Sequence, residues 1–99
     1  IYCPLPLYHS AGGMIGVGTS WYSGSCLVFR KKFSVSRFWE DAATHNCSIV
    51  QYIGELCRYL VLQPPSPFDS SHKVRLAIGN GMRVDVWKQF QERFKVGQI

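Results

Sequence analysis

Two glycines flank an asparagine at the end of a predicted strand. The apolar run at residues 74–78 is typical of a buried strand, and Gly79-Asn80-Gly81 follows it directly. Because glycine has no side chain, the two glycines would let a flat ligand lie close to the backbone. An ordinary tight turn would have the same sequence, so both interpretations stay open for this triplet.

The common nucleotide-binding and hydrolase motifs do not occur in the sequence. There is no P-loop and no G-x-S-x-G, and Gly16-Val17-Gly18, like Gly79-Asn80-Gly81, lacks the third glycine of G-x-G-x-x-G. His9 stands beside Ser10, but adjacent residues seldom face each other and no third member of a triad is evident. A lone histidine in such a turn is more often structural than catalytic.

The charged residues and cysteines exclude several classes of site. Arg30-Lys31-Lys32 is the only basic cluster in a chain of net charge +5, and no aromatic residues are interleaved with it. This pattern argues against nucleic-acid binding and favours a solvated corner over a loose attraction to an anionic membrane.

The four cysteines contain no C-x-x-C pair and have no histidine at metal spacing. They fit a reducing compartment better than a disulfide scaffold or a metal site.

The elements that position these residues are organised around the stretch 48–61. Its first part is a short β-branched run that predicts a strand covered on both faces. After Gly54 the apolar residues recur at helical spacing, which makes one buried helix face ending before Pro64-Pro65. The members of that face are Ile53, Leu56, Cys57, Leu60 and Val61. In open α/β sheets, such a strand–helix junction is where ligands bind.

The whole chain repeats this strand–helix alternation four times. Only a mostly parallel, helix-covered sheet with right-handed crossovers accommodates that order, so the predicted fold class is α/β. The chain begins inside a predicted strand and ends where another strand would start, so we expect residues 1–99 to be a single partial domain, truncated at both ends. The uncharged stretch from Ala11 to Phe29 is a poor membrane span because it is rich in glycine and serine. The expected strands are 1–7, 26–29, 48–53 and 74–78, and the expected helices are 14–22, 35–43, 53–61 and 85–94.

Three stretches together resemble the fatty acid transport protein group of very-long-chain acyl-CoA synthetases, within the adenylate-forming (AMP-binding) superfamily. These stretches are residues 5–12, 51–60 and 74–83, and 31–34 with 37–39 also fit the group. The first stretch is general to the superfamily. The second and the run from Gly79 to Arg83 are specific to the transport-protein group. The resemblance covers essentially the whole chain, in order and with few gaps.

The resemblance implies an ATP-dependent long- or very-long-chain fatty acid–CoA ligase. In that reaction a fatty acid carboxylate attacks the α-phosphate of ATP, and the thiol of coenzyme A then displaces AMP from the acyl-adenylate. The phosphate loop, the Tyr-Gly-x-Thr-Glu motif with its Mg²⁺ ligand, and the mobile C-terminal lysine would lie outside these 99 residues. We therefore expect the fragment alone to be inactive, with no metal ligand of its own.

The resemblance also implies roles for particular residues. His9, with Tyr8, corresponds to the position near the reacting carboxylate, where positioning is expected rather than proton transfer. The expected nucleotide-binding residues are Gly79, Asn80, Gly81, Met82 and Arg83. The residues expected to flank the acyl tunnel are Tyr52, Ile53, Gly54 and Leu56, although core packing would explain these four equally well.

The same resemblance implies a fatty acid partner, no nucleic acid, and membrane association of the longer protein. This segment would face the cytosol, at the endoplasmic reticulum, plasma membrane or peroxisome. Two other functions stay open. The longer protein could be chiefly a lipid-binding or uptake protein with little or no ligase activity, or a nucleotide-binding module without chemistry.

Overall fold

Four parallel strands form the centre of the molecule. The computed structural model describes residues 1–99, except for the side chain of Ala11. The strands are β1 (Tyr2–Cys3), β2 (Val28–Phe29), β3 (Ile49–Ile53) and β4 (Leu76–Asn80). They lie in the order β2-β1-β3-β4. Gln98 adds a parallel bridge to Leu76, so the end of the chain lies beside β4. The predicted parallel α/β fold is confirmed.

A helix follows each strand, as the alternation of patterns predicted. The helices are the π-helix η1 (Ala11–Val17) continuing as α1 (Gly18–Ser23), then α2 (Phe38–Thr44), α3 (Gly54–Leu62), the short 3₁₀ helix η2 (Pro67–Asp69) and α4 (Val84–Phe94). Asn46, which follows α2, has a left-handed φ of 52°. Helix α3 ends at Leu62, and the next residue, Gln63, has the extended backbone that the following proline favours.

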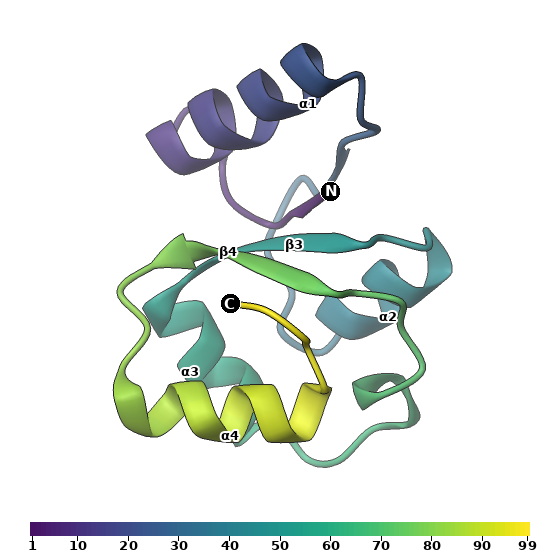
Figure 1. Cartoon of the computed structure of the whole chain (residues 1–99), viewed down its shortest axis with the longest axis vertical. Helices are drawn as coiled ribbons and strands as arrows, with labels where there is room; N and C mark the ends of the chain where they lie inside the picture. The colour runs from purple at the N-terminus through teal and green to yellow at the C-terminus, as the bar shows by residue number, and fades with distance from the viewer.

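The direction in which the chain crosses the sheet decides which face each helix covers. From β1 the chain moves outward to β2, and from β2 it returns past β1 to β3 and β4. Right-handed crossovers that run in opposite directions place their helices on opposite faces. Accordingly, η1 and α1 lie on one face of the sheet, and α2, α3 and α4 lie on the other (Figure 1).

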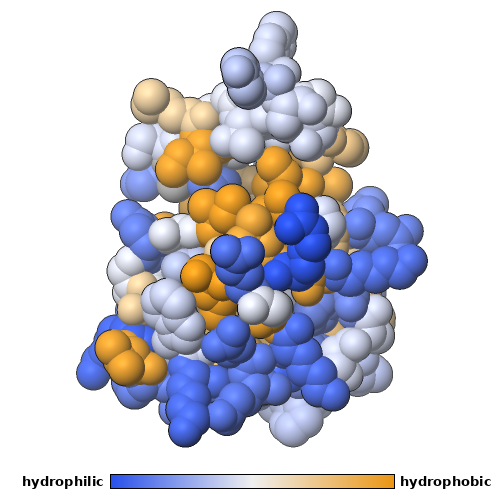
Figure 2. Space-filling model, in the orientation of Figure 1, coloured by the Kyte–Doolittle hydropathy of each residue, from blue (hydrophilic) through white to orange (hydrophobic). Residues whose placement is uncertain are grey.

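The core lies between the sheet and the three helices α2, α3 and α4. Aromatic rings pack edge to face there, with centroids 5.1 Å apart for Tyr2 and Phe38 and 5.0 Å apart for Phe90 and Phe94. Figure 2 shows hydrophilic residues over the part where α4 lies and hydrophobic residues in a band at the level of the sheet. The largest fully buried side chains are Tyr2, Phe38, Phe90, Phe94, Leu60, Val50 and Val96.

Several details differ from the expected elements, among them the start of α2, which lies at Phe38 and not at residue 35. The first strand ends at Cys3, because Pro4 supplies no N–H for the sheet. The strand at Val28–Phe29 is not buried: it is an edge strand, and Phe29 is 54% exposed. The last strand begins two residues later than predicted and includes Gly79 and Asn80. Among the described residues, no helix is both long and apolar enough to cross a bilayer.

Candidate functional site

The chain leaves β1 and β3, which are neighbours, toward opposite faces of the sheet. After β1 it passes to η1 on one face, whereas after β3 it enters α3 on the other (Figure 1). The two connections diverge and leave a crevice at the carboxyl ends of the strands. In open α/β sheets, ligands bind at such a switch point.

A cavity of about 160 Å³ lies at this switch point. Residues of the segment after β1 and of the ends of β3 and β4 line it. Of the residues singled out in the sequence, it brings together His9, Tyr52, Gly79 and Asn80. The full lining is His9, Ser10, Ile15, Gln51, Tyr52, Ile78, Gly79 and Asn80.

Tyr52 leaves no room for a side chain at position 79, so only glycine fits there. The two residues are directly opposite each other in the β3–β4 pairing. A Cβ atom on Gly79 would collide with the carbonyl oxygen of Tyr52 and would lie 2.7 Å from its ring. Tyr52 is 5% exposed, and burial raises the pKa of its phenol, so the side chain is neutral at physiological pH. Tyr52 belongs to the hydrophobic core, so the close contact holds β3 and β4 together beside the cavity.

Gly54 and Gly81 fix the loop that follows β4 against the start of α3. Gly81 has a φ of 76°, a left-handed conformation that glycine adopts without strain. A Cβ atom on Gly54 would collide with the carbonyl oxygen of Gly81. The first residue of α3 and the Gly79-Asn80-Gly81 loop are therefore in contact through their backbones, although neither Gly54 nor Gly81 lines the cavity.

The other residues expected at the site lie around it. Met82 and Ile53 pack against the core, and Leu56 is a core residue that is 3% exposed. Arg83 pairs with Asp85 across 3.3 Å at the start of α4, and both side chains are largely exposed. Tyr8 is 94% exposed and, like these residues, is not among those that line the cavity.

Sequence reasoning missed four lining residues, namely Ser10, Ile15, Gln51 and Ile78. Gln51 carried a signal, because it is the one amide within the apolar run of β3 and it is only 2% exposed. A polar side chain that alternates with buried apolar neighbours faces one side of a sheet, where it must meet a polar surface. Ile15 and Ile78 look like ordinary core residues in the sequence and carried no such signal.

The lining suits a flat, uncharged group rather than a phosphate or a metal ion. It offers amide, hydroxyl, imidazole and backbone groups, and none of its members is an acid, a lysine or an arginine. Among the described residues, no group of three or more side chains could hold a metal ion. A nucleobase or ribose fits these donors and acceptors, whereas a triphosphate would need positive charge that this cavity does not supply.

Comparisons with known proteins match the chain along its whole length. Residues 1–99 match the model of the AMP-binding enzyme family. The chain is 57% identical over all of its 99 residues to long-chain fatty acid transport protein 1 of Homo sapiens. It is 52% identical over 94 residues, 95% of the chain, to long-chain fatty acid transport protein 6 of Mus musculus. In both comparisons the chain spans 15% of the relative's length.

Proposed function

The chain belongs to the AMP-binding enzyme family, and we propose that it is an internal segment of an ATP-dependent long- or very-long-chain fatty acid–CoA ligase. The proposed reaction joins a fatty acid to AMP and then transfers the acyl group to coenzyme A. The names of the similar proteins, which are long-chain fatty acid transport proteins, support the fatty acid as the substrate. We also propose that the longer protein associates with a membrane, with this segment on its cytosolic side.

One observation carries the nucleotide part of this proposal. The switch-point cavity is lined by Gly79 and Asn80, two of the five residues expected to bind the nucleotide, and by Tyr52, which is paired with Gly79. Its uncharged polar lining matches the adenine and ribose, which carry no charge. We propose that the backbone of Gly79-Asn80-Gly81 and the amide of Asn80 hold the nucleoside.

The neighbouring residues receive positioning roles in this proposal. His9 lines the same cavity from the segment after β1, where it would orient the reacting carboxylate. Gly54 would hold the nucleotide loop through its contact with Gly81. The acyl chain would pass beside Tyr52 and Ile53, with Leu56 in the core behind them. Phosphate attack depends on positioning and neutralised charge, so parts outside these 99 residues must supply cations and Mg²⁺ ligands.

ATP–pyrophosphate exchange by the full-length protein tests this function. We expect exchange that depends on a long-chain fatty acid, and we expect Gly79→Ala to reduce it by roughly ten- to a hundredfold through misplacement of the nucleotide. Gly18→Ala is the matched control, because a Cβ atom there meets nothing within 4 Å. Thermal melting of both variants separates a local effect from unfolding. Equal exchange by the two folded variants would refute the role of Gly79.

A second candidate function follows from the printed names of the relatives, which say transport rather than ligation. In that case the longer protein binds or carries fatty acids and forms little or no acyl-adenylate. Fatty acid binding by the full-length protein without any pyrophosphate exchange would favour this second function over the first.

A further inference from the structure

The basic cluster Arg30-Lys31-Lys32 lies at the same edge of the sheet as the switch-point cavity. It directly follows β2, which ends at Phe29. All four strands are parallel, so their carboxyl ends lie at one edge. Only β1 separates β2 from β3, so two strand spacings, about 10 Å, separate the cluster from the end of β3. A ligand that extends from the cavity along this edge therefore comes within reach of the cluster.

The segment 30–34 forms an open hollow of about 310 Å³. The hollow shares no lining residue with the switch-point cavity. Phe33 is 37% exposed and is not among the hydrophobic residues that pack against the core, although Val35, two residues later, is. Two ammonium groups, an aromatic ring and a hydroxyl group therefore stand side by side. The lining consists of Arg30, Lys31, Lys32, Phe33 and Ser34.

The two lysines carry the unbalanced charge of this hollow. Nε of Arg30 lies 3.0 Å from Oδ2 of Asp41, and these side chains are 31% and 17% exposed. The same carboxylate oxygen accepts a hydrogen bond from the hydroxyl of Tyr2 at 3.1 Å. Asp41 therefore fixes Arg30 and neutralises it. Lys31 and Lys32 are exposed and have no ion-pair partner in the part of the chain that the structure describes. Two adjacent cations without counter-charges attract an anion.

These groups together suit a nucleotide that carries a phosphate. Lysine binds phosphate as a compact positive charge with three donors. An exposed aromatic ring offers a face on which a nucleobase stacks. An inorganic phosphate or a simple carboxylate would use the ammonium groups of Lys31 and Lys32 but would leave the ring of Phe33 without a contact.

The proposed ligase reaction uses two nucleotides, ATP and coenzyme A. The α-phosphate of ATP must meet the fatty acid carboxylate at the switch point, so the phosphates of ATP lie there. AMP still occupies that cavity when the thiol attacks, and the nucleotide end of coenzyme A therefore needs a separate site. A long flexible arm joins this nucleotide end to the thiol, so the two ends of coenzyme A can occupy different places at the same edge of the sheet.

We propose that the hollow at 30–34 binds the 3′-phosphoadenosine end of coenzyme A. Lys31 and Lys32 contact the 3′-phosphate, and the ring of Phe33 packs against the adenine. The hydroxyl of Ser34, which lies 3.3 Å from that of Ser36, supplies a further donor at the rim. This inference rests on the proposed ligase function, because that function makes coenzyme A a substrate.

Calorimetric titration of the full-length protein, with AMP present, tests this site. Dephospho-coenzyme A lacks only the 3′-phosphate, so the affinity ratio of the two ligands isolates that group. We expect the wild type to bind coenzyme A about tenfold more tightly, and the double variant Lys31→Ala/Lys32→Ala to bind both ligands equally. Lys73→Ala/Lys88→Ala is the matched control. It removes the same charge from two exposed lysines, one before β4 at the opposite edge of the sheet and one on α4, and it should keep the preference.

Phe33→Leu tests the contact with the adenine. We expect it to weaken the binding of coenzyme A and of dephospho-coenzyme A by the same factor, about fivefold or more, because both ligands carry the base. Equal affinities of Phe33→Leu and the wild type for coenzyme A would show that the ring does not bind the adenine.

ATP–pyrophosphate exchange needs no coenzyme A and separates this inference from the ligase function. All three variants should exchange at the wild-type rate. A wild type without exchange would refute the ligase function, whereas the calorimetric preference judges the site independently of catalysis. The site would be overturned by a wild type that does not prefer coenzyme A, or by a preference that persists in Lys31→Ala/Lys32→Ala. A raised KM for ATP in that variant would assign the lysines to ATP and would equally overturn the proposal.

Discussion

Individual glycines hold the switch-point site together because each lies where a side chain has no room. Gly79 makes space for the ring of Tyr52, and Gly54 makes space for the carbonyl oxygen of Gly81. These contacts join β3, β4 and the start of α3 at one edge of the sheet. At this scale, a single methyl group is enough to change the geometry of the nucleotide loop.

Gly54→Ala is therefore expected to displace Gly81 and to destabilise the protein by about 1–3 kcal/mol, the usual cost of overpacking. In the full-length protein it should raise the KM for ATP in pyrophosphate exchange more than the KM for the fatty acid. Gly97→Ala is the control, since its Cβ would lie 3.4 Å from the nearest atom, an ordinary contact. An unchanged KM for ATP in folded Gly54→Ala would mean that this contact has no role in the site.

His72 makes the stability of the molecule depend on pH. Its Nδ1 accepts the N–H of Val74 at 3.1 Å, and its Nε2 lies 3.1 Å from the carbonyl oxygen of Asp69. Both bonds require a neutral ring protonated at Nε2. Burial lowers the pKa of His72 below its ordinary value of 6.5, although the nearby Asp69 opposes this effect.

The unfolded chain consequently binds a proton at His72 more readily than the folded chain does. The free energy of unfolding should decrease as the pH falls below about 6.5. His72→Phe preserves a ring over Trp39 but cannot titrate, so its urea midpoint should vary less between pH 7 and pH 5. His9 and His45 are present in both proteins and cancel in the comparison. Parallel pH curves for the two proteins would contradict this assignment.

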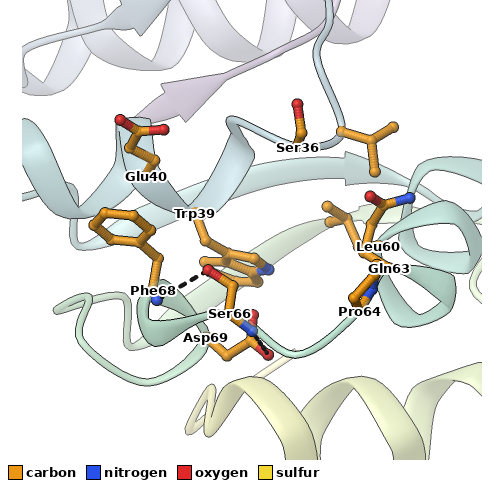
Figure 3. A pocket seen from close by; sticks show the side chains of 10 residues that line it. Ser36, Trp39, Glu40, Leu60, Gln63, Pro64, Ser66, Phe68 and Asp69 are labelled. Carbon is orange, nitrogen blue, oxygen red and sulfur yellow. Dashed lines mark hydrogen bonds between the residues drawn. The ribbon is translucent and has the colours of Figure 1, made fainter.

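At the scale of elements, α4 is joined to the end of α3 and to η2 by one arginine. Arg93 donates to the carbonyl oxygens of Val61 and Pro64, each at 2.9 Å, and pairs with Asp69 at 3.0 Å. The side chains of Arg93 and Asp69 are 23% and 15% exposed, so solvent screens this pair only in part. Pro64 and Asp69 also line a cavity beside Trp39 (Figure 3).

Arg93→Ala should destabilise the fold by about 2–3 kcal/mol, because it leaves a half-buried carboxylate and two carbonyl oxygens without their donor. Arg58→Ala is a matched control: its pair with Glu55 is exposed on the surface of α3, and its loss should leave the urea midpoint almost unchanged. Equal midpoints for the two variants would show that Arg93 does not join these elements.

At the scale of the whole molecule, the two faces of the sheet are covered unequally. Three helices cover one face and enclose the aromatic core, while η1 and α1 alone cover the other (Figure 1). The four cysteines also differ in their exposure to solvent. Cys3, Cys47 and Cys57 are buried, and Cys26, beside the edge strand β2, is exposed. Burial raises the pKa of the Cys57 thiol to about 12.

Alkylation of the native chain with iodoacetamide should therefore modify Cys26 much faster than the other three cysteines. A thiol reacts as its thiolate, and burial removes both the charge and the access that the reaction needs. All four cysteines should react after unfolding in urea, as peptide mass spectrometry would show. Rapid labelling of Cys57 in the native chain would be inconsistent with the enclosed core.

The local order of the elements could be predicted from the sequence alone. The alternation of β-branched runs with helical periodicity predicted four strands and four helices, and parallel pairing followed because each connection contains a helix. Helix α3 agrees closely with its predicted extent, because Gly54 and Pro64 interrupt the pattern at both ends. The resemblance to the AMP-binding family could also be recognised from the sequence, since it rests on residues that are contiguous in the chain.

Only the tertiary structure decided which distant residues meet. Periodicity shows which face of an element is apolar, but it does not show what lies opposite that face. For this reason, His9, Gln51 and Gly79 could not be assigned to one cavity, and Leu56 could not be separated from the residues that line it. The unpaired N–H of Trp39 could not be predicted either, because residues that are distant in the sequence decide whether a buried donor finds an acceptor.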